Sequence, residues 1–160
     1  MCVCVCFSVF LMYANNCILL SRKDNLYYVG NSLGFGVTKS TFDQMVNLYG
    51  ASRDHNTPVI VLHCSQQPDG VSCGLYALAY ATLFAHNIDV HHINKVAFNC
   101  SQLWKWYRTQ FDPIYLQFPA LPPYTLDAHR EDPEVFGSFN DAIQRFRSTT
   151  TEKNMKLFSV

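Results

Sequence analysis

The sequence has no net charge, because twelve Lys and Arg residues balance twelve Asp and Glu residues over 160 positions. A neutral chain gives no electrostatic attraction for nucleic acid or for an anionic membrane, so neither is expected as a partner. Repeats and low-complexity tracts are also missing, whereas 49% of the residues are hydrophobic. This length and composition are those of one folded domain with a buried core, and they exclude a disordered chain.

The cysteines lack the spacing of a disulfide framework or of a metal site. Seven are present, at irregular intervals and without a C-x-x-C pair. Cys2, Cys4 and Cys6 alternate at the period of a β-strand, so they share one face and resemble small apolar side chains. A zinc site would need further ligands at metal-like spacing. We therefore expect no metal or cofactor, and free thiols in a reducing compartment, the cytoplasm or the nucleus.

The first 21 residues contain no Asp, Glu, Lys or Arg. A signal peptide or a membrane anchor would give such a run. However, the basic segment that opens a signal peptide is missing, and Asn15 and Asn16 interrupt the apolar stretch. We therefore interpret the run as two buried strands, over 2–13 and 17–21, and expect no membrane attachment.

A hairpin and a helix are predicted next. A short strand over 26–29 follows the strand over 17–21 across a polar four-residue turn, which indicates an antiparallel hairpin. Apolar residues at helical spacing then predict a helix over 38–49. Ser40 or Thr41 is the expected cap of this helix, because a short hydroxyl side chain satisfies the free N–H groups of the first turn.

The middle of the sequence holds its most apolar segments. A strongly apolar stretch over 58–63 predicts a buried strand, and a polar loop containing Pro and Gly follows it. Residues 73–86 then read as a helix that is apolar almost all round, which is typical of a helix in a core. An antiparallel sheet packed on a central buried helix belongs to the α+β class.

Beyond the buried helix the patterns weaken. One further helix is expected around 101–109, and four prolines then interrupt regular structure. From about residue 124 the chain is polar, with a weak helical pattern over 135–146. We therefore divide the sequence into a folded domain, 1–123, and a polar C-terminal tail, 124–160.

One segment points to a chemical function. Residues 66–81 read Q-Q-P-D-G-V-S-C-G-L-Y-A-L-A-Y-A, so Cys73 follows a glycine-containing loop and begins the buried helix. The free N–H groups and the dipole at a helix N-terminus stabilise a thiolate, which makes a cysteine there a better nucleophile. The same N–H groups can bind an oxyanion, and the amide of Gln67 can donate to it, with Gln66 as the next candidate. Most free cysteines are buried and inert, so the segment alone leaves both interpretations open.

The sequence Gln-Pro-Asp-Gly-x-x-Cys-Gly before an apolar helix resembles the active-site signature of the ubiquitin-like-protein proteases, the SUMO-protease family, including versions carried in mobile elements. The resemblance covers about 14–119 and is strongest over 58–81. It implies a papain-like (adenain-like) fold for 1–123, with Cys73 as the nucleophile and Gln67 in the oxyanion hole. It also implies a cysteine-type peptidase that cleaves after the C-terminal Gly-Gly of a ubiquitin-like modifier.

In this family a hairpin supplies the other two members of the catalytic triad. The segment L-Y-Y-V-G-N-S-L over 26–33 is similar to the strand that ends in the family's aspartate, which puts Asn31 at that position. Asparagine can orient a histidine through its side-chain carbonyl. The family's His-Trp pair would fall near A-N-N-C at 14–17, with Asn16 at the approximate histidine position. This chain therefore departs from the family pattern, because its base histidine is not found there.

The other histidines do not replace the missing one. His86 lies about 20 Å along the same helix, at a rise of about 1.5 Å per residue. The remaining histidines are in strand ends, loops or the tail: His55, His63, His91, His92 and His129. A cysteine without a base lacks the group that takes its proton and later protonates the leaving amine. Two alternatives therefore accompany the peptidase: an inactive relative that binds a ubiquitin-like protein, and a decayed mobile-element fragment.

Overall fold

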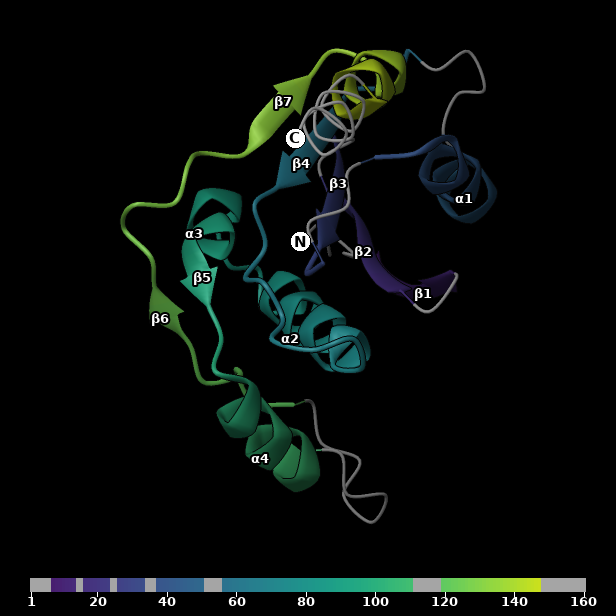
Figure 1. Cartoon of the computed structure of the whole chain (residues 1–160). Coiled ribbons are helices and arrows are strands. Elements are labelled where there is room, and N and C mark those ends of the chain that lie inside the picture. Colours follow the sequence, from purple (N-terminus) through teal and green to yellow (C-terminus); the bar gives the residue numbers. More distant parts are fainter. Residues whose placement is uncertain are drawn as a thin grey trace, which may run out of the picture.

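The computed structural model describes residues 7–13, 16–23, 26–33, 37–50, 56–110 and 119–147. Its strands are β1 (Phe7–Tyr13), β2 (Asn16–Lys23), β3 (Leu26–Asn31), β4 (Val59–Leu62), β5 (Val96–Ala97), β6 (Thr125–Leu126) and β7 (Glu134–Phe136). Its helices are α1 (Lys39–Tyr49), α2 (Cys73–Ala85), α3 (Val90–Lys95) and α4 (Cys100–Gln110), and residues 139–147 are also helical (Figure 1). Among these helices, none is long and apolar enough to cross a bilayer.

The main sheet has the strand order β1-β2-β3-β4-β7. The predicted hairpin is confirmed, because β2 and β3 pair antiparallel with Lys23 opposite Leu26. The prediction of a wholly antiparallel sheet is wrong at one place, since β3 and β4 run parallel. A parallel pair needs a crossover connection, and α1 lies in the connection between these two strands. β5 and β6 form a separate small sheet.

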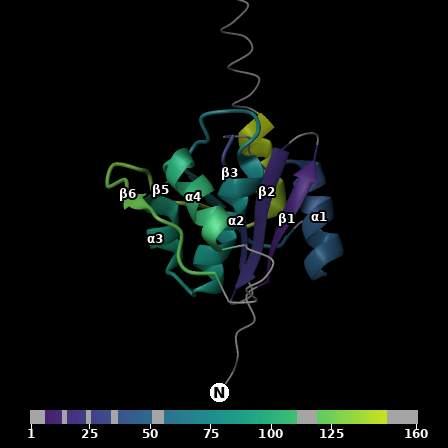
Figure 2. The same ribbon diagram turned by 90° about the horizontal axis from the view of Figure 1, so that it is seen from below.

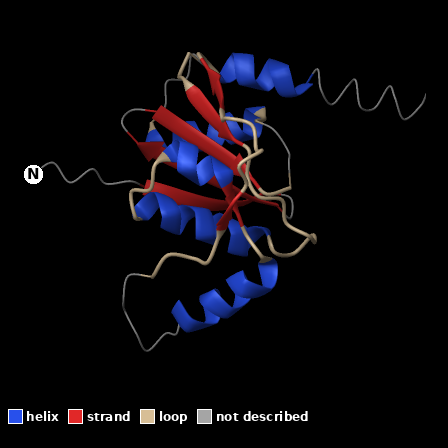
Figure 3. Cartoon of the chain, turned by 90° about the vertical axis from the view of Figure 1, so that its left-hand side faces the viewer, coloured by secondary structure: helices blue, strands red, loops and turns tan. Residues whose placement is uncertain are grey.

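Helices cover both faces of the main sheet (Figures 2 and 3). Alternate residues of a strand point to opposite faces, and the two core clusters follow this rule. Tyr28 and Ile60 pack with α2, α3 and α4, whereas Tyr27 and Val59 pack with α1 and the helix 139–147. β4 is buried on both faces, which explains why its sequence is apolar at every position. This mixture of helices and sheet agrees with the α+β class.

The helix predicted over 38–49 is present as α1, but its cap is a different residue from the one expected. Its N-cap is Thr38, whose side chain accepts from the Thr41 N–H group, while the Thr41 hydroxyl accepts from the Thr38 N–H group. The prediction of Ser40 or Thr41 as the cap is therefore wrong, although Thr41 completes the capping box. Gly50 ends the helix in the left-handed conformation, with φ at 64°.

α2 confirms the prediction of a buried helix that begins at Cys73. Its most deeply buried side chains, Tyr76, Ala79 and Leu83, are at most 1% exposed. The helix packs across β1 and β2 as well as against α3 and α4. Because protein surrounds the helix on most sides, an apolar sequence without a polar stripe suits it.

Residues 124–147 belong to the folded domain, so the predicted division at 123 is wrong for them, while residues 148–160 lie outside the described residues. β6 pairs with β5, and β7 adds an antiparallel strand beside β4. The helix 139–147 buries Phe139, Ala142 and Ile143 in the core cluster under α1. Three apolar residues at helical spacing are enough to dock a helix, but they gave only a weak signal because the residues between them are polar.

Two other expectations need adjustment. The helix expected around 101–109 is present as α4, and the shorter α3 precedes it. The weak helical pattern over 135–146 is a strand at its beginning and a helix only from residue 139. The predicted strands near the N-terminus are present as β1 and β2, while Cys2, Cys4 and Cys6 lie outside the described residues.

Candidate active site

Cys73 is the first residue of α2, at the end of the helix that meets the 66–72 loop. The N-cap residue, Ser72, makes no capping hydrogen bond with its side chain. Its hydroxyl instead donates to the carboxylate of Asp69 at 2.9 Å. Cys73 is 7% exposed and forms a small buried cluster with Ala77, apart from the two larger clusters. The first turn of α2 therefore holds a buried thiol, and the Ser72 side chain does not cap its N–H groups.

Asp69 shapes the turn directly before the cysteine. Its carboxylate accepts hydrogen bonds from the N–H groups of Val71 at 2.9 Å and Ser72 at 2.7 Å. These hydrogen bonds, together with the one from the Ser72 hydroxyl, hold the pKa of Asp69 below its usual value. Sequence reasoning quoted Asp69 only as part of the signature. Its place before Gly70 is the local signal for this turn, because Asp side chains often bond to N–H groups two and three residues on.

Gln67 is buried in the loop and held at both ends of its amide. Its side-chain oxygen accepts from the hydroxyl of Ser32, and its side-chain nitrogen donates to the backbone carbonyl of Asp69. The Gln67 backbone N–H group also donates to the Ser32 carbonyl at 3.0 Å. The second N–H of the amide has no hydrogen-bond acceptor among the described residues. Gln66, the next candidate, is exposed and donates to the Cys64 carbonyl.

Asn31 ends β3 and is 7% exposed. Its Oδ1 accepts from the Leu33 N–H group at 2.9 Å, which fixes the orientation of the amide. Its Nδ2 is buried without a hydrogen-bond partner among the described residues. To orient a histidine, this residue must accept a hydrogen bond from the ring. The Leu33 N–H group uses one of the two lone pairs of Oδ1, so one acceptor site remains.

Ser32 was not singled out from the sequence. It follows Asn31 directly, and its hydroxyl and carbonyl both bind Gln67, although 35 positions separate the two residues. These contacts join the end of β3 to the loop before the cysteine. The only sequence signal for this role is its position next to Asn31 in the N-S-L segment.

Asn16 is the first residue of β2 and pairs with Tyr13 of β1. Two residues further along β2, Ile18 is the register partner of Asn31. The backbone pairing therefore brings position 16 to the same end of the hairpin as Asn31. Residues 14 and 15, the neighbouring candidates for the histidine position, lie outside the described residues, and the assignment at 16 stays a prediction.

Several histidines have partners away from the cysteine loop. The His63 Nε2 is buried without a hydrogen-bond partner among the described residues and lies 3.9 Å from a carboxylate oxygen of Glu134 in β7. The His92 Nε2 is 3.1 Å from the hydroxyl of Tyr124, and the His86 Nε2 is 2.8 Å from the carbonyl oxygen of Pro119. The side chains of two others, His91 and His129, are exposed, and His55 lies outside the described residues. None of these contacts involves the 66–72 loop.

A second thiol, Cys64, lies at the end of β4 in a different environment. Burial raises the pKa of Cys64 to about 12, although the charge of Arg130 and hydrogen bonds from Asn31 and Tyr80 oppose this shift. Burial likewise raises the pKa of Tyr80 well above its usual value. The Tyr80 hydroxyl accepts from the Ser65 N–H group at 2.6 Å and donates to the Val96 carbonyl at 3.2 Å. This cluster holds β4, α2 and β5 together, and its thiol is protonated at neutral pH.

We expect iodoacetamide at pH 8 to leave Cys64 unlabelled in the native protein. With a pKa of about 12, only about one molecule in ten thousand carries the reactive thiolate at that pH. Cys100, which is partly exposed, is the internal control and is expected to react. Peptide mapping by mass spectrometry measures both sites. Labelling of Cys64 as fast as Cys100 would contradict the buried environment, and both sites should react once the chain is unfolded.

No protein-family model, curated protein or solved structure matches this chain. Over the part of the chain that the structure describes, His, Cys, Asp and Glu side chains do not gather in threes or more as a metal site requires. The function is therefore inferred from the residues and their geometry.

Proposed function

We propose that this chain is a cysteine-type peptidase domain with the papain-like (adenain-like) layout of the ubiquitin-like-protein proteases. The observation that carries the proposal is the pair of hydrogen bonds between Ser32 and Gln67 beside the helix that Cys73 begins. These bonds bring together the two segments in which the resemblance was found. A catalytic-type site needs such a meeting of distant segments, whereas an isolated Cys-Gly pair does not.

The proposed chemistry begins with the Cys73 thiolate. Its sulfur attacks the carbonyl carbon of the last glycine in the C-terminal Gly-Gly of the substrate, and the carbonyl oxygen becomes an oxyanion. N–H groups at the start of α2 and the second N–H of Gln67 stabilise this oxyanion. When the intermediate collapses, the C–N bond breaks, the amine leaves with a proton, and a thioester remains. Water then hydrolyses the thioester and restores the thiol.

No residue has been assigned as the base or the acid of this site. The leaving amine needs a general acid, and the attacking thiol needs a base. The histidine expected near 14–17 from the resemblance is not there, which favours a second candidate function. In that alternative the domain binds a ubiquitin-like protein in the cytoplasm or nucleus and cleaves it slowly or not at all.

Hydrolysis and binding assays test the proposal together. We expect the wild type to bind purified SUMO-type or ubiquitin-type proteins and to release a fluorophore slowly from their C-terminal fluorogenic derivatives. Cys73→Ala should remove hydrolysis and keep binding, because the thiol is the nucleophile. Gln67→Ala should lower hydrolysis by about a hundredfold, the usual loss for one oxyanion donor.

Gln66→Ala is the matched control, since the amide of this exposed neighbour donates to the Cys64 carbonyl, and it should leave the rate unchanged. Binding without any hydrolysis would identify the second candidate as the function. A wild type that neither binds nor cleaves any ubiquitin-like protein would overturn both.

A further inference from the structure

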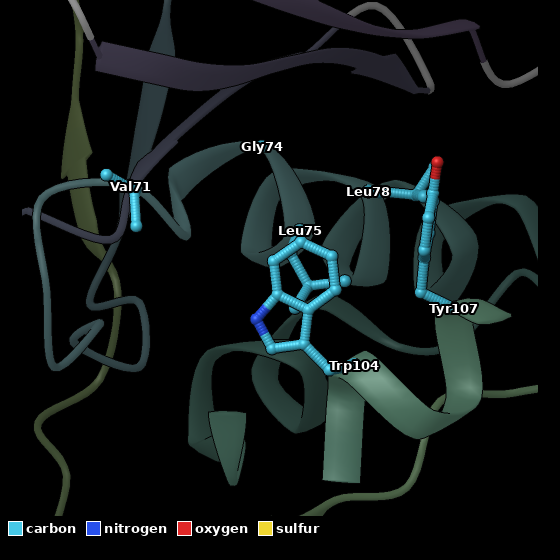
Figure 4. A pocket seen from close by; sticks show the side chains of 6 residues that line it. All are labelled: Val71, Gly74, Leu75, Leu78, Trp104 and Tyr107. Atoms are coloured by element: carbon cyan, nitrogen blue, oxygen red, sulfur yellow. The ribbon is translucent and has the colours of Figure 1, made fainter. Parts of the chain in front are cut away.

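A pocket of about 360 Å³ lies between α2 and α4. Figure 4 shows Trp104 and Tyr107 of α4 standing across from Leu75 and Leu78 of α2. Val71 and Gly74 complete the lining. The size falls within the range of small ligand and side-chain sites.

This pocket is separate from the candidate nucleophile. Residues four apart share a face of a helix, so Gly74 and Leu78 lie together on one side of α2. Cys73 packs with Ala77 in its own buried cluster. At 100° per residue, Leu75 and Leu78 point well away from the direction of Cys73. Occupying the pocket therefore does not require the thiol.

The rim of the pocket exposes large apolar side chains. Val71 is 82% exposed, Trp104 41% and Tyr107 39%. The two aromatic rings contact each other edge to face, with their centroids 6.0 Å apart. Two other residues of α4, Leu103 and Trp106, are buried and hold the helix against the core. Exposed Trp and Tyr side chains around a pocket are typical of an interaction hot spot. The helix that carries them is held in place by its buried residues.

The charges that α4 carries next to the pocket have one sign. α4 carries Lys105 and Arg108 and contains no Asp or Glu. Both cations are exposed, and neither forms an ion pair among the described residues. Arg108 is four residues from Trp104, so the two share a helix face. The carboxylate of Asp69, two residues before Val71, is engaged by the N–H groups of its own turn. The rim therefore favours an anionic partner.

We propose that the pocket between α2 and α4 docks an acidic segment of a partner protein. One apolar side chain of the segment enters the pocket between Trp104 and Leu75, and its carboxylates lie against Lys105 and Arg108. The charge complementarity selects an acidic segment, and the aromatic rim supplies most of the affinity. This inference does not rest on the proposed peptidase function, because it needs neither the Cys73 thiol nor the Gln67 amide.

Fluorescence anisotropy with labelled peptides tests the docking site on the full chain. The probe is a short fluorescein-labelled peptide with a central Phe between Glu residues. Two matched peptides replace the Glu residues with Lys or the Phe with Ala, and both are expected to bind at least about tenfold more weakly. Trp104→Ala should weaken binding of the probe by about tenfold or more. The double variant Lys105→Glu with Arg108→Glu should weaken it at low ionic strength, with the difference shrinking as salt rises.

Two variants keep the result interpretable. Lys39→Glu changes an exposed cation of α1, on the other face of the sheet, and should not alter binding (Figure 1). Cys73→Ala should also bind normally, which separates this site from the peptidase proposal. Circular dichroism checks that each variant is folded. Equal binding of all three peptides, preference for a single-stranded oligonucleotide, or Trp104-dependent self-association in sedimentation without peptide binding would each overturn the proposal.

Discussion

Changing Asn16 to His and Asn31 to Asp together is expected to raise hydrolysis of a ubiquitin-like fluorogenic substrate by about a hundredfold or more over the wild type. The new histidine would take the proton from the Cys73 thiol and later give it to the leaving amine. The new carboxylate would replace the unpaired Nδ2 of Asn31 with an acceptor for the histidine ring. The gain is expected to exceed the sum of the single changes, because the two residues act as one unit.

The two single variants show why both substitutions are needed. Asn31→Asp alone buries a carboxylate without a charged partner, so we expect it to destabilise the fold and to give no rate gain. Asn16→His alone should give only part of the gain, since nothing orients its ring. Ala14→His and Asn15→His, each combined with Asn31→Asp, cover the neighbouring alignments of the hairpin.

Steady-state kinetics decide this prediction, with two controls. Asn140→His adds a histidine at an exposed position of the helix 139–147 and should leave the rate unchanged. Adding Cys73→Ala to the active double variant should abolish turnover. Fast wild-type hydrolysis that disappears in Cys73→Ala would show that the site already has a base, with His63 or His55 as the next candidates.

Replacing Phe139 with Ala is expected to lower the free energy of unfolding by about 3–5 kcal/mol, the usual cost of emptying a buried aromatic site. Phe139 is fully buried, and its ring packs edge to face against Phe42 of α1 and Tyr27 of β3, with centroids 5.1 and 6.5 Å apart. The side chain thus joins the C-terminal helix to the sheet and to α1. A loss of this size is a large part of the stability of a typical domain.

Chemical denaturation followed by circular dichroism measures this loss. Val135→Ala is the matched control, because Val135 belongs to the same C-terminal segment but is 71% exposed in β7. It should change the free energy of unfolding by no more than about 0.5 kcal/mol. An unchanged stability in Phe139→Ala would mean that the segment after residue 123 contributes nothing to the fold.

Local patterns in the sequence were sufficient for the elements around the cysteine. The uninterrupted apolar run from Cys73 predicted α2 and its first residue, because a helix buried on most sides requires such a run. The two short strands on either side of a polar turn likewise predicted the hairpin of β2 and β3. The position of Gln67 in a loop before the helix followed from the proline and glycine that come after it.

Only the tertiary structure decided how distant segments meet. Ser32 binds Gln67, and Phe139 packs on Phe42, through contacts between residues that no local pattern connects. The orientation of the Asn31 amide depends on the turn at Leu33, and the pocket beside Trp104 depends on how α4 docks on α2. The sequence by itself determined the helices and strands from β1 to α2 and where the thiol lies, because these depend on neighbours along the chain. The tertiary structure decided which groups the thiol site contains and that residues 124–147 belong to the core, because burial and hydrogen bonding depend on neighbours in space.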